Sequence, residues 1–295
     1  MRRDELIAIP TCPVHSARVN AFMALLRTTL PTAAQFPLAY VHVAGAQATL
    51  IVKAHRFTGA DVDELLLGLP ATGLEGCWVH CHPSAGRKLF ARSGWHHIWG
   101  RPLSFDEDGL AHGPMAFRQL LPSLHATAMD EAATHLGARP GVAVLDLYCG
   151  IGATLRRWTG HGAEALGIEL SGGAVSAAQR NAPVASVLRG TCVQRLPQIN
   201  TWWAERGSAV ERVVYVNPPR SGLEVEITAA MIESWRPRRI AYLSCSAGTL
   251  ARDLALLVQA GYWVEALLPF DFFPLTHHVE CLALLTRADA PERSS

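Results

Sequence analysis

The chain has 295 residues, of which 49% are hydrophobic, and this size and composition support a buried core and exclude a disordered chain. The formal net charge of +1 gives no overall attraction to nucleic acid, and no apolar run approaches the roughly 18 residues that span a membrane. Seven scattered cysteines, an odd number, are typical of free thiols in a reducing compartment, so we expect a cytoplasmic protein with no membrane partner.

The first part of the chain, residues 1–112, predicts a small α+β domain. The apolar spacing of VNAFMALLRTTL is typical of an amphipathic helix, DVDELLLGL indicates a short second helix, and two strands are expected on either side of Gly45. The two helices are expected at residues 19–30 and 61–69, and the two strands within residues 38–57. One further strand is expected at residues 74–81. We expect the apolar face of the first helix to anchor residues 1–12 by packing alone.

Residues 113–295 alternate short β-rich runs with helix-like segments, which is typical of a doubly wound parallel sheet. The β-rich runs are VAVLDLY, EALGIEL, ASVLRG, RVVYVNPP, RRIAYLSC, YWVEALLPF and VECLALLTR. Only a loop separates the last two runs, so they should pair antiparallel. The helix after RRIAYLSC is expected to open at Thr249. The predicted fold class is therefore α/β, with a seven-stranded Rossmann-like domain after the smaller α+β domain.

In an open α/β sheet the ligand binds beyond the carboxyl ends of the strands. Those ends carry Asp146, Glu169, Gly190, Asn217 and Cys245. LDLYCGIGATL places Gly150 and Gly152 in the first strand-to-helix turn, where the missing Cβ lets the backbone approach a ligand. Glu169 follows about twenty residues later, where an acid accepts hydrogen bonds from ribose hydroxyls.

The same turn distinguishes two kinds of nucleotide ligand. Leu155 stands where a dinucleotide-binding motif needs its third glycine, so a mononucleoside is favoured and S-adenosylmethionine fits. An NAD-dependent oxidoreductase remains an alternative, because it would explain the βαβ unit and Glu169. It would not explain the chemistry at the end of the chain.

That chemistry is a thiol paired with a carboxylate. If the final strand runs antiparallel to RRIAYLSC, Glu280 comes to the edge that carries Cys245. A thiolate that adds to carbon 6 of a pyrimidine turns the ring into an enolate, and carbon 5 can then take a methyl group from a sulfonium. A base must remove the carbon 5 proton, and Glu280 is the candidate at that place.

Four motifs, DLYCGIG, NPPRSGL, LSCSAGTLARDL and FDFFPLTHHVECLALL, resemble in order and spacing those of the RNA (uracil-5-)-methyltransferase family. The resemblance implies S-adenosyl-L-methionine as cofactor and RNA as partner, with Cys245 attacking carbon 6 and Glu280 abstracting the carbon 5 proton. The cofactor-binding residues that it implies are Gln119, Tyr148, Gly150, Glu169 and Asn217. The residues that it implies for the target nucleotide are Phe117, Asn217 and Arg220.

Departures from the family pattern bear on the substrate. Asn217 stands where most of the family has aspartate, which resembles the branch that methylates uracil in large-subunit (23S) rRNA, so we prefer rRNA to tRNA. The Asn217 amide suits uracil in one orientation and cytosine in the other, which leaves a cytosine-5 methyltransferase open. Thr191 and Ser246 replace an acid near the adenine and the asparagine after the nucleophile. A catalytically inactive RNA-binding relative would also carry such neutral replacements.

Contact with RNA is expected from the small domain and from arginine, which supplies 24 of the 26 basic residues. The candidates are Arg87, Arg92 and Arg220. Nothing in the sequence calls for a second copy of the chain, and we expect a monomer.

Two parts of the sequence contain cysteines that could bind a metal. One lies in GCWVHCHPS and GWHHIWG, with Cys77, His80, Cys81, His82, His96 and His97. On a strand Cys77 and Cys81 would lie about 13 Å apart, too far for one zinc ion, so buried or base-stacking side chains are expected and no metal. The other is Cys12, which resembles the fourth ligand of the [4Fe–4S] cluster that many relatives carry. The other three ligands have no counterpart here, so no iron–sulfur cluster is expected.

Overall fold

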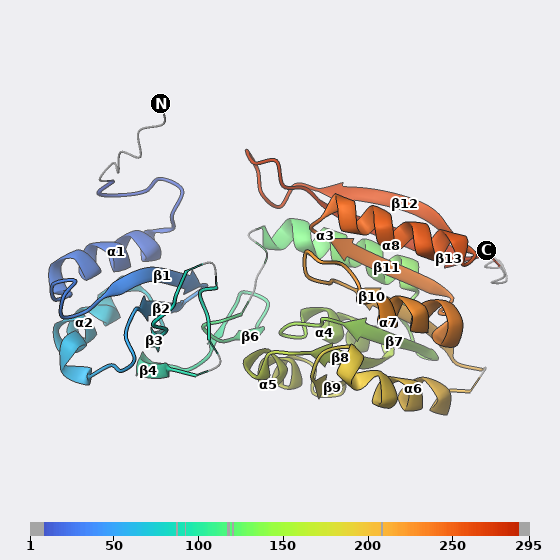
Figure 1. Cartoon of the computed structure of the whole chain (residues 1–295), viewed down its shortest axis with the longest axis horizontal. Coiled ribbons are helices and arrows are strands. Elements are labelled where there is room, and N and C mark those ends of the chain that lie inside the picture. Colours follow the sequence, from blue (N-terminus) through green and yellow to red (C-terminus); the bar gives the residue numbers. More distant parts are fainter. Residues whose placement is uncertain are drawn as a thin grey trace. The chain divides into compact units, whose positions relative to one another are not determined.

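A computed structural model describes residues 9–86, 88–91, 93–116, 119, 121–207 and 209–288 (Figure 1). The chain divides into two compact units, residues 1–116 and 117–295. The division falls four residues after 112, the last residue of the predicted small domain. A short hairpin and the turn after it, in which the Ala116 amide donates to the Gly113 carbonyl (3.2 Å), complete the first unit.

The first unit is built on a four-stranded sheet of order β1-β2-β3-β4, in which only β2 and β3 are parallel. The strands are β1 (Leu38–Ala44), β2 (Gln47–Val52), β3 (Gly76–Cys81) and β4 (Trp95–Gly100), and the separate hairpin is β5 (Ser104–Phe105) and β6 (Ala111–His112). The helices are α1 (Ala17–Thr29) and α2 (Asp63–Gly68), with 3₁₀ turns at Gly59–Val62 and Leu69–Thr72. The α+β prediction for this part of the chain is confirmed.

The segment before α1 is held by polar contacts as well as by packing. Asn20 accepts a hydrogen bond from the Cys12 amide (3.0 Å) and donates one to the Cys12 carbonyl (2.9 Å). Arg27 donates to the carbonyls of Pro10 and Ile9. The expectation that packing alone anchors this segment was wrong, because these side chains project from α1 toward the preceding backbone.

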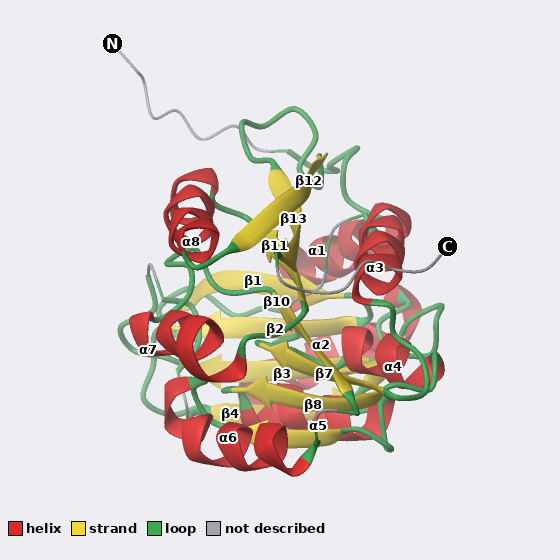
Figure 2. Ribbon diagram, turned by 90° about the vertical axis from the view of Figure 1, so that its right-hand side faces the viewer, coloured by secondary structure: helices red, strands yellow, loops and turns green. Residues whose placement is uncertain are grey.

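The second unit is a seven-stranded sheet of order β12-β13-β11-β10-β7-β8-β9 with helices on both faces (Figure 2). Its strands are β7 (Val142–Leu147), β8 (Glu164–Glu169), β9 (Ser186–Arg189), β10 (Glu211–Val216), β11 (Arg239–Ser244), β12 (Tyr262–Phe270) and β13 (Glu280–Arg287). β13 runs antiparallel to both of its neighbours, β12 and β11, and the other neighbouring pairs are parallel. The Rossmann-like prediction, including the antiparallel final pair, is confirmed.

Two apolar layers hold this sheet. Helices α3 (Pro122–Leu136), α4 (Ala153–Gly160) and α5 (Gly172–Asn181) pack on one face, which we call the α3 face. Helices α6 (Leu196–Glu205), α7 (Val225–Ala229) and α8 (Ala247–Gln259) pack on the other, with a 3₁₀ turn at Val193–Arg195 and a π-helix at Ala230–Trp235. Alternate residues of the strands belong to opposite layers, as the two-residue period of a strand requires, except in β12, where the layer changes at the register shift between Val264 and Ala266. No helix among the described residues is long and apolar enough to cross a membrane.

Helix α8 begins two residues before Thr249. Its N-cap is Ser246 and its first residue is Ala247. The Thr249 hydroxyl instead donates to the Arg220 carbonyl (3.3 Å), so this side chain ties the helix to the loop after β10.

Candidate active site

The turn between β7 and α4 is shaped by left-handed backbone at three positions. Gly150 and Gly152 have φ of +56° and +79°, and Tyr148, which has a side chain, has φ of +63°. A Cβ on Gly152 would lie 2.9 Å from the Cα of Ala178 in α5, so only glycine lets the turn pass this close to the helix. The Asn181 amide donates to the Ile151 carbonyl (2.8 Å) and holds the turn from the α5 side.

Glu169, the last residue of β8, is fastened to this turn. Its Oε2 accepts from the Gly150 amide (3.2 Å) and its Oε1 accepts from the Ser171 amide (2.7 Å). A carboxylate has about four acceptor positions, so two backbone donors orient Glu169 and leave it able to accept from a vicinal diol. The predicted neighbours Gly150 and Glu169 are therefore in contact.

Tyr148 bridges the turn to the loop after β10. Its hydroxyl donates to the Glu224 carboxylate, and burial is the first cause that raises the pKa of Tyr148. The Cys192 thiol lies beside the same hydroxyl, and burial raises its pKa to about 12. Sequence analysis did not single out Glu224 or Cys192, and NPPRSGLE offered only the position of Glu224 at the end of a motif.

Thr191 serves as a local cap. Its hydroxyl accepts from the Gln194 amide (3.1 Å), while the Gln194 side chain accepts from the Thr191 amide (3.1 Å). This reciprocal pair is a capping box for the turn at Val193–Arg195. The neutral replacement at Thr191 thus has a structural role in this chain.

Residues of α8 hold the loop from Asn217 to Glu224 through hydrogen bonds. Asp253, only 1% exposed, accepts from the Leu223 amide (2.9 Å) and from the Tyr242 hydroxyl (2.7 Å). Arg252 donates to the Ser221 carbonyl (3.0 Å). Asn217 is half-buried at the end of β10, and Arg220 is exposed. Asp253 was missed because it is thirty positions away from its partner Leu223.

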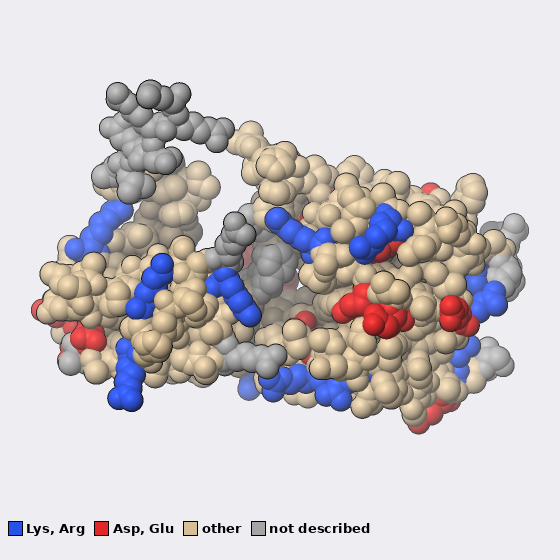
Figure 3. Space-filling model, viewed as in Figure 1, with Lys and Arg blue, Asp and Glu red and all other residues tan. Residues whose placement is uncertain are grey.

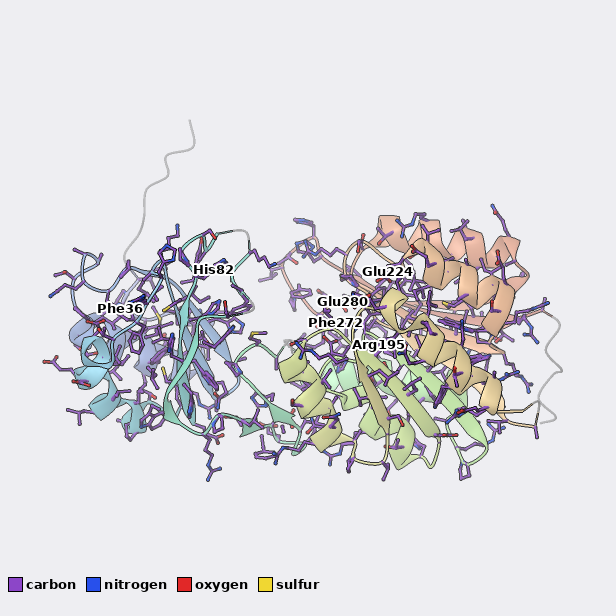
Figure 4. The ribbon with its side chains drawn as sticks, turned by 60° about the horizontal axis from the view of Figure 1, so that its bottom comes forward. Phe36, His82, Arg195, Glu224, Phe272 and Glu280 are labelled. Atoms are coloured by element: carbon purple, nitrogen blue, oxygen red, sulfur yellow. The ribbon has the colours of Figure 1, made fainter. Side chains whose placement is uncertain are left out.

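The register of two strands bears on the predicted pair Cys245 and Glu280. β11 and β13 pair antiparallel as far as Ser244 opposite Cys281, and this register, continued by one position beyond the end of β11, would bring Cys245 opposite Glu280. Leu243 and Leu282 belong to the layer on the α3 face, so alternation puts both Cys245 and Glu280 on that face. Glu280 lies at the same end of the unit as Glu224 (Figure 4).

The backbone around Cys245 is held by its predecessor. The Ser244 hydroxyl, 4% exposed, donates to the Ser246 carbonyl (3.1 Å) and accepts from the Ser246 amide (3.2 Å). Cys245 is half-buried and directly precedes the N-cap of α8, where the helix dipole favours negative charge.

Glu280 is a buried carboxyl that has Gln119 as its side-chain partner among the described residues. Only 4% of it is exposed, and this burial raises the pKa of Glu280, while a hydrogen bond from Gln119 Nε2 (2.9 Å) acts in the lowering direction. The Oε1 of Gln119 is buried and has no hydrogen-bond partner within the part of the chain that the structure describes. It is an acceptor available to a bound molecule.

Asp146 differs from the other strand-end residues. It lies one position before the end of β7, is fully buried, and accepts from Trp158 Nε1 (2.8 Å). Burial raises the pKa of Asp146 to about 7, against the lowering effect of hydrogen bonds from Thr154 and Trp158. Asp146 is thus part of the core beneath the site.

Asp146→Asn is expected to remove a pH dependence of stability. Because the pKa of Asp146 is 3.8 unfolded and about 7 folded, the folded chain binds more protons in this window and stability falls as pH rises through it. The loss amounts to at most about 4 kcal/mol at about 1.4 kcal/mol per pKa unit. Asparagine keeps an acceptor for Trp158 and cannot ionise, so urea unfolding should find the variant equal to the wild type at pH 3, below both pKa values, and more stable at pH 8.

The matched control for this prediction is Asp130→Asn. The Asp130 side chain is 67% exposed and pairs with Arg157, so its removal should leave the pH slope of the unfolding free energy unchanged. An Asp146→Asn variant with the wild-type slope would show that Asp146 is ionised in the folded chain at neutral pH.

Three predicted residues, Phe117, Arg87 and Arg92, lie outside the described residues. On the face drawn in Figure 3, basic side chains are scattered over both units and do not gather in one patch. RNA contact by the small domain therefore stays a prediction.

The cysteine and histidine side chains of the first unit are distributed over both faces of its sheet. Cys77 packs in the apolar core with Val79, and burial raises its pKa to about 12. His80, one position away from Val79, stacks on Trp95 with ring centroids 4.0 Å apart and accepts from the Ala91 amide (2.9 Å). Among the described residues, no group of three or more His, Cys, Asp or Glu could hold a metal ion.

The sequence of this chain is similar to one family model and to curated RNA methyltransferases. Residues 207–288 match the family model described as tRNA (Uracil-5-)-methyltransferase. An uncharacterized RNA methyltransferase of Oceanobacillus iheyensis is 34% identical over 193 residues, 64% of this chain and 42% of that protein. Another, of Gloeobacter violaceus, is 29% identical over 307 residues, 96% of this chain and 64% of that protein. These matches support the predicted resemblance of the chain to the RNA (uracil-5-)-methyltransferase family.

A solved structure shares the fold of this chain. The tRNA (uracil-54, C5)-methyltransferase of Pyrococcus abyssi, in complex with S-adenosyl-L-homocysteine, matches with a TM-score of 0.66 at 18% identity, over 96% of this chain and 70% of that one. This likeness shows a shared fold, the sequence matches support the predicted family, and the 23S rRNA branch within it stays a prediction. The chain spans less than two thirds of the length of either curated relative.

Proposed function

We propose that this chain is an S-adenosylmethionine-dependent RNA methyltransferase that forms 5-methyluridine. The observation that supports the proposal is the antiparallel pairing of β11 with β13, whose register, continued by one position, would bring Cys245 opposite Glu280. A nucleophile and a base side by side at a strand edge suit a reaction in which a thiol adds to a ring and a proton must later leave it. An NAD-dependent oxidoreductase has no use for this pair.

The residues at the other end of the site fit the cofactor. The glycine turn keeps side chains away from its backbone, and Glu169, oriented by two amides, can accept from both ribose hydroxyls. Gln119 presents a buried acceptor that lacks a partner among the described residues. We assign Gln119, Tyr148, Gly150, Glu169 and Asn217 to S-adenosylmethionine, which supplies a methyl group activated as a sulfonium.

The protein residues then carry the ring chemistry. Cys245 forms a bond to carbon 6 of the pyrimidine, and the electron pair of the 5,6 double bond makes carbon 5 nucleophilic. After methylation of carbon 5, Glu280 takes the carbon 5 proton, the double bond reforms, and the Cys245 sulfur leaves with its electron pair. The raised pKa of Glu280 suits this step, because a stronger base accepts the proton more readily.

The RNA substrate that we propose is large-subunit (23S) rRNA, with Asn217 as the reason, and with Phe117, Asn217 and Arg220 at the target nucleotide. A tRNA substrate is the second candidate, because the matching family model and the similar structure are both named for tRNA. The Asn217 amide leaves cytosine as a target to be tested beside uracil.

Mapping of 5-methylpyrimidines tests these proposals together. Total RNA from cells with and without the gene should differ by a 5-methyluridine in large-subunit rRNA, and the purified chain should restore it in an unmodified transcript. A difference confined to tRNA, or a lost 5-methylcytidine, would select the tRNA or cytosine alternative. Binding of S-adenosylmethionine with no difference in any RNA would favour a catalytically inactive relative.

A further inference from the structure

The loop between β12 and β13, residues 271–279, carries an exposed leucine at its tip. Leu275 has an exposed fraction of 107%, so its side chain contacts almost nothing of its own chain. Its φ is +67°, in the left-handed region that leucine rarely adopts. Strained backbone of this kind costs free energy and clusters at functional sites, so the side chain held at this position is a candidate for a functional contact.

The loop holds this tip in place. At its base Phe272 is fully buried and stacks on Phe270, with ring centroids 5.8 Å apart. The Thr276 hydroxyl donates to the Phe273 carbonyl (2.7 Å) and accepts from the His278 amide (3.1 Å). These bonds close a compact turn around Leu275, and the loop projects beyond the ends of β12 and β13 (Figures 1 and 2).

The loop leads directly into the proposed active site. Leu275 precedes Glu280 by five residues, and Glu280 is the position that the continued β11–β13 register would bring opposite Cys245. Asp271, at the start of the loop, is its only acidic residue, while His277 and His278 lie side by side near its end with ring centroids 4.3 Å apart. The remaining residues of the loop can approach phosphate groups without charge repulsion.

The proposed reaction needs a base outside its stack. Cys245 must reach carbon 6 from above the ring plane, and in stacked RNA that face is covered by the neighbouring base. A nucleotide that leaves the stack opens a gap, and apolar side chains such as leucine fill gaps of this kind in nucleic-acid complexes. We propose that Leu275 is a wedge that enters the RNA stack at the place the target pyrimidine vacates.

This inference rests on the proposed function, and its test uses two RNAs of one sequence. The segment around the mapped methylation site is made as a hairpin that keeps the target nucleotide stacked, and as an unstructured strand. Leu275→Asn keeps a residue that tolerates left-handed backbone but removes the apolar wedge. We expect kcat/KM to fall about tenfold or more on the hairpin and to stay within about twofold on the strand.

Two controls separate a wedge from a structural role. Leu275→Met retains an apolar side chain of similar size and should keep most of the wild-type activity on the hairpin. Val184→Asn removes another exposed apolar side chain, 79% exposed between α5 and β9, and should affect neither RNA.

The possible outcomes are distinct. An equal loss on hairpin and strand would mean that Leu275 only supports the loop, and no loss on either would mean that it does not touch RNA; both overturn the wedge. Failure of the wild-type chain to methylate any RNA would overturn the proposed function, and the wedge with it.

Discussion

Cys245→Ala is expected to abolish RNA methylation while leaving cofactor binding intact. Addition of the sulfur to carbon 6 is the step that makes carbon 5 reactive, so no other group in the site can replace it. We expect turnover to fall by at least about 10⁴-fold, as for loss of a catalytic nucleophile in other enzymes. Transfer of radioactive methyl groups to RNA measures the loss, and calorimetry with S-adenosylmethionine should give a dissociation constant within about twofold of the wild type.

The matched control is Cys281→Ala. Cys281 directly follows Glu280, is half-buried, and packs with the layer on the opposite face of the sheet. Its loss should change methylation little, although it removes a thiol of similar burial. Substantial turnover by the Cys245→Ala variant would mean that the thiol at the end of β11 is a core residue after all.

The strands of the second unit were predictable because their pattern is set locally. β12 occupies the predicted residues 262–270, and its exposed and buried positions alternate through Trp263 and Leu267. Helix α3 was not predicted, because half of its buried residues, Ala128, Ala132 and Ala133, are alanines and give a weak apolar signal. β4 was missed because its burial does not alternate and a register shift separates Cys77 from Trp78 in its pairing with β3.

Some contacts of the candidate site could also be predicted from the sequence, and others could not. Glu169 and Gly150 could be paired from the sequence, because a βαβ unit brings the end of its second strand to the first turn. Cys245 and Glu280 followed from the direction of one strand. Contacts that depend on side-chain reach across loops, such as Tyr148 to Glu224, have no spacing rule and became visible only in the folded chain.

Glu280 also carries a pH dependence. Because the pKa of Glu280 is raised by burial, the carboxylate is lost at a higher pH than for an ordinary glutamate, and kcat/KM should fall on the acid side accordingly. Gln119 acts in the opposite direction through its hydrogen bond. The same bond orients the carboxyl group, so the base and the residue proposed to touch the cofactor are mechanically linked.

Glu280→Gln is expected to stop the reaction after methyl transfer. Glutamine preserves the shape of the side chain and cannot accept the carbon 5 proton, so the sulfur cannot leave and the protein stays bound to RNA. Turnover should fall by about 10²- to 10⁴-fold, the usual contribution of a general base. A denaturing gel should show a shifted protein–RNA band that contains a radioactive methyl group when the cofactor is labelled.

The double variant Cys245→Ala with Glu280→Gln supplies the control for this band. Without the sulfur no covalent bond can form, so the shifted band must disappear even though both variants retain the buried fold around β13. If Glu280→Gln alone gives no band under conditions where the wild type turns over, Glu280 is not the base. A band that lacks the labelled methyl group would place the role of Glu280 before methyl transfer, because the adduct would then have stalled at carbon 6 addition. Only a band carrying both RNA and methyl label agrees with proton removal by the carboxyl group that the continued β11–β13 register would bring opposite Cys245.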